Sequence, residues 1–219
     1  TFDPEYINSL ELGAKTRLFD NTLQANVTWF YYDYEGLQIS KITNQTSLNE
    51  NFDATIQGFE GEFIWVPDQH WRVSVNLAWL DSELDGGSSL DPADINGLGT
   101  TENIVSTPNA NVSVGPGCPG GVVPCAGIEQ SLDGNTLPNA PEFSVNLGIA
   151  YSWQLKGGMD LVAATNYYWQ DEFYASNFNN ISNLVDDWSM WNASARLAGE
   201  QWYIEAWIKN IEDNDNVTG

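Results

Sequence analysis

The sequence predicts an all-β chain, part of an antiparallel up-and-down transmembrane β-barrel, with about eight strands in four hairpins. Apolar residues recur at every second position along most of the chain, which is the period of a strand and not of a helix. These runs span 10 to 16 residues, longer than the five or six residues typical of soluble strands. Short turns near 20, 68, 157 and 200 alternate with longer connections near 45, 85 to 138 and 179. An up-and-down barrel has this alternation.

The first two hairpins precede the longest connection. Leu10 to Leu18 alternate with polar residues, and the turn residues Asp20-Asn21 lead into a second alternating run from Leu23 to Tyr31. A polar stretch at about 41 to 51 is interpreted as a longer loop. Alternation returns from Phe59 to Trp65, and a tight turn at 67–70 leads into the run from Trp71 to Trp79.

The last two hairpins follow a long acidic connection at about 85 to 138. That segment holds 10 of the 19 glycines and 6 of the 9 prolines, with six acidic residues and no Lys or Arg. Beyond it, the alternating runs at 143–153 and 161–169 flank the turn Lys156-Gly157-Gly158. A polar connection near 175 to 183 leads to the runs at 191–197 and 202–208.

Composition excludes several function classes. The chain has 30 acidic and 7 basic residues and a net charge of -23, so no nucleic acid is expected as a partner, because phosphate backbones bind basic surfaces. With 10 Trp, 9 Tyr and 9 Phe, the chain is too aromatic for a disordered acidic tail. A single histidine, His70, leaves little for metal or nucleophile chemistry. We therefore expect no enzyme, no metal site and no cofactor.

The sequence predicts no membrane-spanning helix and no signal peptide. No apolar run approaches the 18 or more residues of a membrane helix, and Thr1 opens without the basic start and apolar core of a signal peptide. If the chain is exported, we expect it to be a mature part or a fragment.

The two faces of the strands fit a barrel in lipid, which is apolar outside and polar inside. Trp65, Trp71, Trp153 and Trp202 lie beside the short turns, and Tyr31, Trp79, Tyr167 and Trp169 lie towards the longer loops. These sets predict two aromatic girdles. Charged residues share the opposite face and predict a lumen charge network; its members are Glu11, Lys15, Arg17, Glu60, Glu62, Arg72, Arg196, Glu205 and Lys209.

Several motifs resemble the C-terminal barrel portion of TonB-dependent outer-membrane receptors. Their order and spacing over nearly the whole chain carry the resemblance, because no single motif is specific. They are Pro4-Glu5 with Glu11-Leu12-Gly13-Ala14-Lys15, Phe30-Tyr31-Tyr32-Asp33-Tyr34, Gly58-Phe59-Glu60-Gly61-Glu62, Leu137-Pro138-Asn139-Ala140-Pro141, and Lys209-Asn210-Ile211-Glu212-Asp213.

This resemblance implies a 22-stranded barrel in the outer membrane of a Gram-negative bacterium. The family imports scarce nutrients such as siderophore-bound iron, cobalamin or oligosaccharides, using a plug domain and the TonB complex. Residues 1–219 would be part of one barrel domain, about a third of a receptor. The plug, the TonB box and the last strand, which ends in an aromatic residue in the family, are not found in this segment. The implied partners are outer-membrane lipid, the protein's own plug, the TonB complex and a small-molecule or oligomeric nutrient.

Two other classes of function stay open. One is a passive pore or a structural or assembly partner at the cell surface. The other is a soluble carbohydrate-binding β-protein, a sandwich or propeller whose alternating stripes face its own core. A soluble protein would not need aromatic girdles, and short turns would not be separated so consistently from long loops.

A few side chains are candidates for specific roles. Cys118 and Cys125 lie in the long loop, where oxidising conditions outside the cell favour a disulfide over a metal site. The acidic residues of that loop are expected to be solvated, since no calcium-binding ladder is present. Glu60 and Glu62 balance lumen charge and are not a catalytic pair. Tyr32, Tyr34, Trp188 and Trp207 could stack on a ligand, or pack against the plug or the barrel wall.

Overall fold

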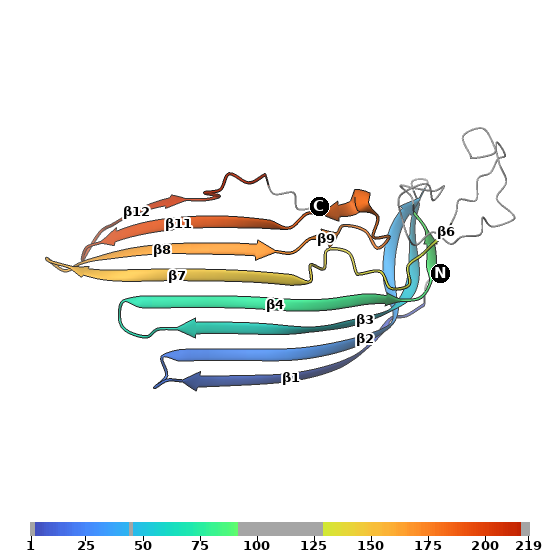
Figure 1. Cartoon of the computed structure of the whole chain (residues 1–219), viewed down its shortest axis with the longest axis horizontal. Coiled ribbons are helices and arrows are strands. Elements are labelled where there is room, and N and C mark those ends of the chain that lie inside the picture. The colour runs from blue at the N-terminus through green and yellow to red at the C-terminus, as the bar shows by residue number, and fades with distance from the viewer. Residues whose placement is uncertain (1–2, 44–45, 92–128, 216–219) are drawn as a thin grey trace.

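The structure is a computed structural model that describes residues 3–43, 46–91 and 129–215. Its centre is an eight-stranded antiparallel sheet in which strands adjacent in the sequence lie side by side (Figure 1). The strands are β1 (Tyr6–Leu18), β2 (Leu23–Thr43), β3 (Thr46–Trp65), β4 (Trp71–Asp85), β7 (Phe143–Leu155), β8 (Met159–Gln170), β11 (Trp188–Ala198) and β12 (Tyr203–Ile208). The predicted eight strands, four hairpins and up-and-down order are confirmed.

Smaller elements lie in the longer connections. The strand β5 (Ser88–Leu90) pairs with β6 (Glu129–Ser131), and β9 (Phe173–Tyr174) pairs with β10 (Leu184–Val185). A single 3-10 turn, η1 (Ile181–Asn183), precedes β10. Within the described ranges, no helix has the length and apolarity that a membrane-spanning helix needs.

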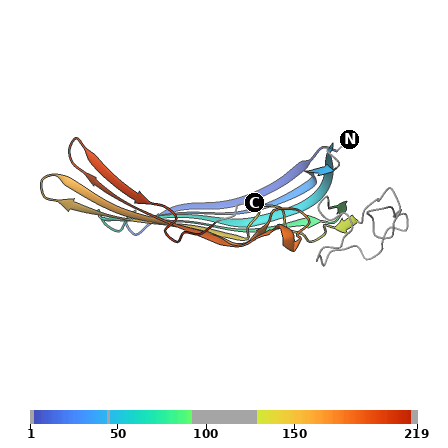
Figure 2. The ribbon, with the colours of Figure 1, turned by 90° about the horizontal axis from the view of Figure 1, so that it is seen from above.

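The sheet is a curved, open trough (Figure 2). Its short-turn end carries the turns near 20, 68, 157 and 200, and its loop end carries the longer connections. In the part of the chain that the structure describes, the outermost strands β1 and β12 each pair along one edge only. The trough therefore has two long faces. Its two edges, along β1 and β12, carry backbone N–H and C=O groups that do not pair with another strand of the described sheet.

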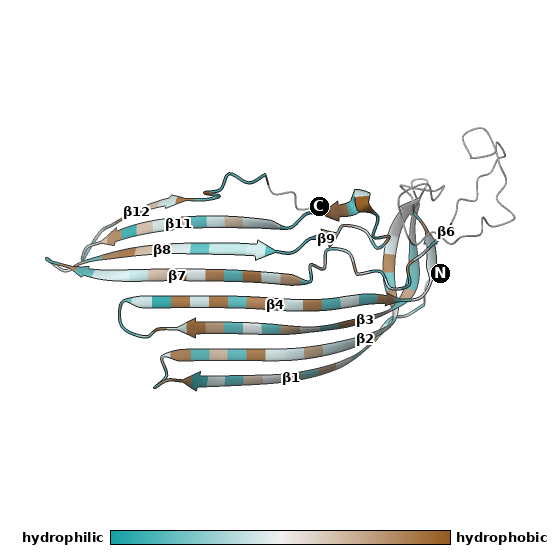
Figure 3. Cartoon of the chain, viewed as in Figure 1, coloured by the Kyte–Doolittle hydropathy of each residue, from teal (hydrophilic) through white to brown (hydrophobic). Residues whose placement is uncertain are grey.

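The register places the apolar stripes of all eight strands on one face, here called the apolar face. Leu12 lies opposite Trp29, and the same row continues across β3, β4 and β7. Tyr167 of β8 lies opposite Trp191 of β11, and Ala193 opposite Ile208 of β12. The opposite, polar face carries the charged and amide residues. Brown and teal segments alternate along β3 and β4 in Figure 3. A one-residue slip in any pair would break this separation.

The apolar stripe of β4 has the length that a membrane requires. It runs from Trp71 to Trp79, about eight residue steps or ~26 Å at ~3.3 Å per residue. The lipid-facing band of outer-membrane barrels is about 25 Å tall. Beyond Trp79 the same face carries Asp81, Glu83 and Asp85, and Asp81 accepts a hydrogen bond from Gln57 at 2.9 Å. The apolar band therefore ends at this point on the loop side.

The polar stretch at 41–51 is not the loop that the sequence predicts. β2 continues to Thr43 and β3 begins at Thr46, so the two strands extend 21 and 20 residues as one hairpin. A membrane crossing takes about 9 to 11 residues, and the surplus of about ten residues reaches ~30 Å beyond the band. At the base of this projection, the backbone N–H of Gly36 donates to Asp53 at 2.9 Å.

The buried core lies at the loop end and not in the middle of the sheet. Phe52, Ala54, Leu84, Leu132 and Phe178 form one buried cluster, with Tyr34, Leu37, Ile39 and Leu137 packed against it. These residues come from β2, β3, β4 and the two long connections. Burial of these apolar side chains joins segments distant in sequence into one folded unit above the apolar band.

Candidate functional site

The polar face holds a cavity of about 480 Å³ that crosses six strands, from β1 to β8. Its wall combines charged, amide and aromatic side chains, among them Lys15, Asn26, Glu60, Glu62, Asn146 and Tyr168. Pockets of this volume are in the range that small ligands occupy. Because the cavity is on the face opposite the lipid-type stripes, it is the first candidate for contacts with a ligand or with another part of the protein.

Cross-strand register assembles this wall. Lys15 lies opposite Asn26, Asn26 opposite Glu62, and the row continues through β4 and β7 to Tyr168. Asn26 donates to Glu62 at 2.7 Å, and Asn166 donates to Asn146 at 2.5 Å. Neighbouring side chains on one face of a sheet interact in this way. The hydrogen bonds fix the side-chain amides of Asn26 and Asn146 in the wall of the cavity.

The strand register places the nine predicted charge-network residues on the polar face, with Lys209 one residue beyond the end of β12. Glu11 accepts a hydrogen bond from the Tyr32 hydroxyl at 2.8 Å. Arg196 lies opposite Glu205, and its guanidinium carbon is 4.4 Å from the centre of the Tyr203 ring. These observed contacts are with neutral groups, so direct pairing between the basic and acidic members stays a prediction.

The four candidate ligand-contact aromatics do not form one cluster. Tyr32 stacks on Phe30 with ring centres 5.0 Å apart, and Tyr34 packs against the buried core at the loop end. Trp188 contacts Tyr168 with ring centres 5.0 Å apart. Trp207 lies opposite Ser194 on the polar face and is 68% exposed. Two of the four therefore lie on β2, one on β11 and one on β12.

The sequence places Phe30 on the polar face, but neither Phe30 nor Tyr168 was among the predicted site residues. Each is an aromatic residue at a position whose strand neighbours two residues away are mostly polar. The register puts Phe30 opposite Glu11 and Tyr168 opposite Asn146. Their position out of phase with the apolar stripe was the signal that could have found them.

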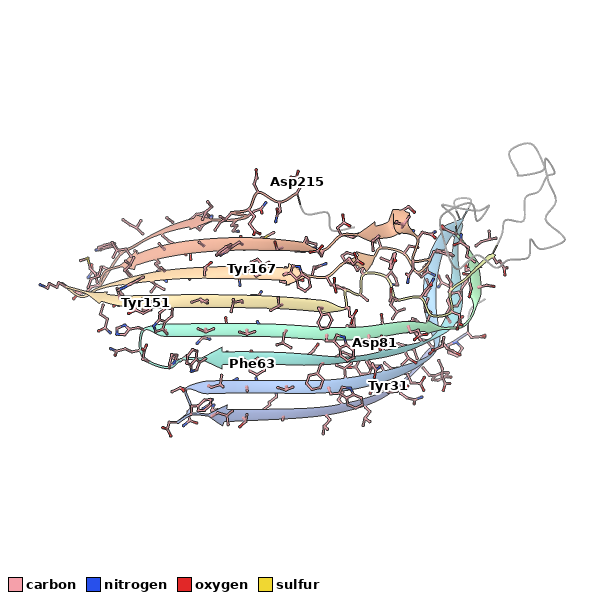
Figure 4. All side chains as sticks on the ribbon, viewed as in Figure 1. Tyr31, Phe63, Asp81, Tyr151, Tyr167 and Asp215 are labelled. Atoms are coloured by element: carbon pink, nitrogen blue, oxygen red, sulfur yellow. The ribbon has the colours of Figure 1, made fainter. Side chains whose placement is uncertain are left out.

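An aromatic cluster marks the short-turn end of the apolar face. Tyr151 lies edge-on to Trp71 at 4.6 Å and tilted against Trp153 at 4.5 Å, measured between ring centres. His70 stacks on Tyr151, and its Nδ1 lies 2.7 Å from the carbonyl oxygen of Ser152. Figure 4 labels Tyr151 near this end and Tyr31 nearer the other. Two members of the first predicted girdle, Trp71 and Trp153, thus pack together through Tyr151.

Indole N–H groups at the loop end bond to carboxylates. Trp79 donates to Glu142 at 3.1 Å, and Trp169 donates to Asp187 at 3.2 Å. Amphipathic rings of this kind lie at membrane interfaces with an apolar body and a polar tip. Trp79 and Trp169 are two of the four members of the second predicted girdle, and the girdle as a whole stays a prediction.

In the turn between β3 and β4, two backbone hydrogen bonds hold the carboxylate of Asp68 in place. Asp68 Oδ1 accepts hydrogen bonds from the backbone N–H of His70 at 2.7 Å and of Trp71 at 3.0 Å. These bonds, chiefly the one from His70, hold the pKa of Asp68 below its ordinary value. The carboxylate caps the turn that starts β4.

Two sequence predictions fall outside the described residues. Cys118 and Cys125 lie there, as do Asp94 and Glu102 of the long loop. The disulfide stays a prediction. Among the residues that the structure describes, no group of three or more His, Cys, Asp or Glu side chains could hold a metal ion.

Solved structures show the same fold. The ferric yersiniabactin uptake receptor FyuA from Yersinia pestis aligns at 16% identity with a TM-score of 0.66, over 97% of this chain and 26% of that one. BauA, the ferric preacinetobactin receptor from Acinetobacter baumannii, aligns at 17% identity with a TM-score of 0.62, over 97% and 26%. The copper transporter OprC aligns at 12% identity with a TM-score of 0.61, over 99% and 26%. The chain thus spans about a quarter of the length of these proteins.

The comparison with curated protein sequences gives no match. The family described as "TonB dependent receptor-like, beta-barrel" matches residues 1–211, nearly the whole chain. The family match places the chain in the outer membrane of a Gram-negative bacterium. The apolar face of the sheet is consistent with this location. The chain belongs to the TonB-dependent receptor β-barrel family.

Proposed function

We propose that the chain is part of an outer-membrane receptor that imports a scarce nutrient with energy delivered by the TonB complex. The observation that carries this proposal is the polarity of the sheet, whose apolar face is exposed and is the reverse of a soluble protein's packed apolar face. Eight strands present apolar stripes in register on one face, while charged and amide groups line the other. A soluble sheet would pack its apolar face against a second layer, whereas Leu12 and Ile204 are 72% and 65% exposed.

The open edges support a larger barrel. Hydrocarbon cannot satisfy free backbone N–H and C=O groups, so a lipid-embedded sheet has to close on itself. We infer that β1 and β12 pair with further strands of the same protein. Residues 1–219 would then be part of one barrel domain of about 22 strands, with the plug domain outside this segment.

The names of the similar proteins are the available guide to the class of nutrient. FyuA is described as a ferric yersiniabactin uptake receptor, BauA as a ferric preacinetobactin receptor and OprC as a copper transporter. These names support import of a scarce nutrient. Siderophore-bound iron, cobalamin and oligosaccharides are all compatible with a polar lumen. Tyr32, Tyr34, Trp188 and Trp207 are proposed ligand contacts, and the charge network on the polar face is proposed to line the lumen. No catalytic role is proposed for any residue.

Growth under nutrient limitation tests the proposal. Cells that lack the full-length receptor are compared with cells that lack TonB under limiting iron, cobalamin or oligosaccharide. We expect both losses to slow growth under the same limitation, and the expressed receptor to restore growth only in cells with TonB. Restoration that does not need TonB would indicate a passive pore. No growth difference under any limitation would favour a structural role at the cell surface.

A further inference from the structure

Polar side chains are buried at the loop end, on the inner face of the β5–β6 ribbon. Ser89 lies opposite Gln130 in the ladder, and Asp91 follows two residues after Ser89, in phase with it. These three side chains are 2%, 0% and 2% exposed. The ribbon lies beside the projecting part of the β2–β3 hairpin (Figure 1), where the Ser89 hydroxyl donates a hydrogen bond to Glu50 of β3. The ribbon therefore turns polar groups into the interior.

Asp91 departs from what the long acidic connection predicts. The composition of that connection indicates solvated carboxylates, and Asp85, Glu129 and Asp133 are exposed. The carboxylate of Asp91 is instead buried, and it accepts a hydrogen bond at 2.5 Å from Nδ2 of Asn180, in the connection between β9 and β10. Burial of a carboxylate costs free energy unless positive charge and hydrogen bonds compensate for the lost water.

Asn180 supplies a second, independent observation. Its side chain is 5% exposed, and its Oδ1 atom accepts no hydrogen bond from the described residues. Because Nδ2 of the same amide is bonded to Asp91, this oxygen belongs to the same buried polar cluster. A buried oxygen without a donor is unfavourable, and such groups in folded proteins call for an unmodelled water or ion. The amide oxygen and the carboxylate thus offer two adjacent acceptors to a positively charged ligand.

The available ligand atoms are those that a hard cation prefers. Calcium takes six to eight oxygen ligands at about 2.3–2.6 Å, and it accepts amide carbonyl groups and waters beside carboxylates. Zinc prefers nitrogen and sulfur ligands, and no group of three or more His, Cys, Asp or Glu side chains in the described ranges could hold a metal ion. Magnesium needs a near-ideal octahedron. Two carboxylates supplemented by neutral oxygens therefore favour calcium.

We propose that Asp91, Glu50 and Oδ1 of Asn180 bind a calcium ion, with Gln130 as a further oxygen ligand. The ion joins three segments, which are the projecting hairpin, the end of β5 and the connection between β9 and β10. Two residues along the chain from Glu50, Gln130 and Asn180, each of these segments enters the buried core at the loop end. Calcium thus stabilises the loop end as one folded unit, whichever nutrient the receptor binds.

Lys41 is the alternative source of positive charge. The register places it opposite Leu48, two positions along β3 from Glu50. If Lys41 balances the buried carboxylates, calcium has no effect on stability, and Lys41→Gln destabilises the receptor equally with and without calcium. That pair of results would overturn the calcium site.

The test strips the full-length receptor in detergent with EGTA and titrates it with calcium chloride by calorimetry, with magnesium chloride in a parallel titration. We expect calcium to bind at least tenfold more tightly than magnesium. Asp91→Asn and Glu50→Gln should each weaken calcium binding about tenfold, and Asn180→Leu about fivefold. Asp133→Asn removes an exposed carboxylate of the same connection, so it should change the affinity less than twofold.

Urea unfolding separates calcium binding from a purely structural role. Calcium should raise the urea midpoint of the wild type and leave that of Asp91→Asn unchanged. If the bond between Asp91 and Asn180 only anchors the connection, Asp91→Asn will lower the midpoint by the same amount in calcium and in EGTA, which would overturn the site. Glu50 is partly exposed, so Glu50→Gln keeps the test valid if Asp91→Asn does not fold.

Three titration results would also overturn the site. They are the absence of saturable calcium binding, magnesium binding as tight as calcium binding, and equal weakening by Asp133→Asn and Asp91→Asn. The titration needs neither TonB nor a nutrient, so its failure leaves the uptake proposal intact. A receptor that binds calcium but supports no TonB-dependent growth keeps the calcium site and loses the uptake function.

Discussion

Gly58 is a position at which the polar face has no room for a side chain. A Cβ added there would lie 2.5 Å from Cζ of Phe30 and 2.5 Å from the carbonyl oxygen of Trp79. We expect Gly58→Ala to destabilise the folded receptor by about 1–3 kcal/mol, the usual cost of overpacking. Gly13→Ala is the matched control, since its nearest contact is the Thr28 hydroxyl at 3.3 Å.

Urea unfolding of the full-length receptor measures the difference between the two glycine variants. Because one of the two close contacts is backbone, truncating Phe30 in the Gly58→Ala background should restore only part of the stability. Equal stability of the Gly58 and Gly13 variants would contradict the close packing of Phe30 on Gly58.

Asp68 makes the stability of one turn depend on pH. Its pKa is lowered in the folded state by the backbone N–H groups of His70 and Trp71. A carboxyl with a depressed folded pKa contributes stability above its unfolded pKa, and this contribution is lost as the pH falls through the folded value. We expect Asp68→Ala to destabilise the receptor at pH 7, and the difference from wild type to shrink in acid below the ordinary pKa of Asp.

The urea midpoint at neutral and at acidic pH measures this effect. Asp160→Ala is the control, because Asp160 is an exposed carboxylate near the same end. A difference between wild type and Asp68→Ala that stays constant with pH would show that the carboxylate charge does not stabilise the turn.

At the residue level, the sequence predicted which face each charged side chain occupies, because the period of two is local information. It did not predict contacts that depend on the register between strands. Phe30 covers Gly58, and Tyr168 rests on Trp188, but no local pattern tells which residues will lie opposite each other. Likewise, no local pattern indicates that Tyr151, 81 positions away, stacks on His70.

The strand β4 tests the assignment of the two faces. Val75 lies near the middle of its apolar stripe, and Asn76 is the next residue, on the polar face. We expect Val75→Arg to cost about 2–4 kcal/mol, because a cation would enter the centre of the hydrocarbon band. Asn76→Arg should be tolerated, since its side chain points into the cavity beside Glu62.

Heat-dependent mobility of the folded receptor on gels shows how much of each variant assembles. A soluble protein in which the apolar stripe faces a core would also reject Val75→Arg. It would, however, fold without detergent, so the same assay in detergent-free buffer separates the two interpretations. Folding of Val75→Arg at the wild-type level would contradict the lipid-facing assignment.

At the level of elements, the period of two predicted the membrane-crossing strands. It did not predict that β2 and β3 continue beyond the apolar band as one long hairpin. Residues such as Asn49, Glu50 and Asn51 are polar on both faces, so 41–51 shows no alternation. Those residues form strand because β2 and β3 continue their ladder, and because Phe52 and Leu37 pack in the core at the loop end. The β5–β6 pairing joins residues about 40 positions apart, which no short-range pattern can indicate.

For the whole molecule, the two ends of the sheet differ in charge as they differ in the length of their connections. Lys15, Arg17, Arg72, Lys156 and Arg196 lie in the half nearer the short turns. The described parts of the long connections instead carry carboxylates such as Asp133, Asp171 and Asp187. The separation of the short turns from the connections near 85–138 and 179 was predictable from the sequence, since it needs only their lengths. The connection near 45 was wrongly predicted as a loop, because β2 continues to Thr43 and β3 begins at Thr46.

This polarity sets the orientation of the receptor in the membrane. Outer-membrane barrels keep short turns on the periplasmic side and long loops outside. In a background with Cys118 and Cys125 replaced by serine, Ser182→Cys lies in an exposed part of the loop end, and Lys156→Cys lies in an exposed short turn. We expect a membrane-impermeant maleimide to label Ser182→Cys on intact cells. It should label Lys156→Cys only after the outer membrane is permeabilised.

Labelling of both variants in detergent provides the control for reactivity, since each thiol is then equally accessible. Label on Lys156→Cys but not Ser182→Cys in intact cells would reverse the orientation and place the long connections in the periplasm. Equal labelling of both on intact cells would show that neither end is protected by the membrane, which is incompatible with an apolar band between them.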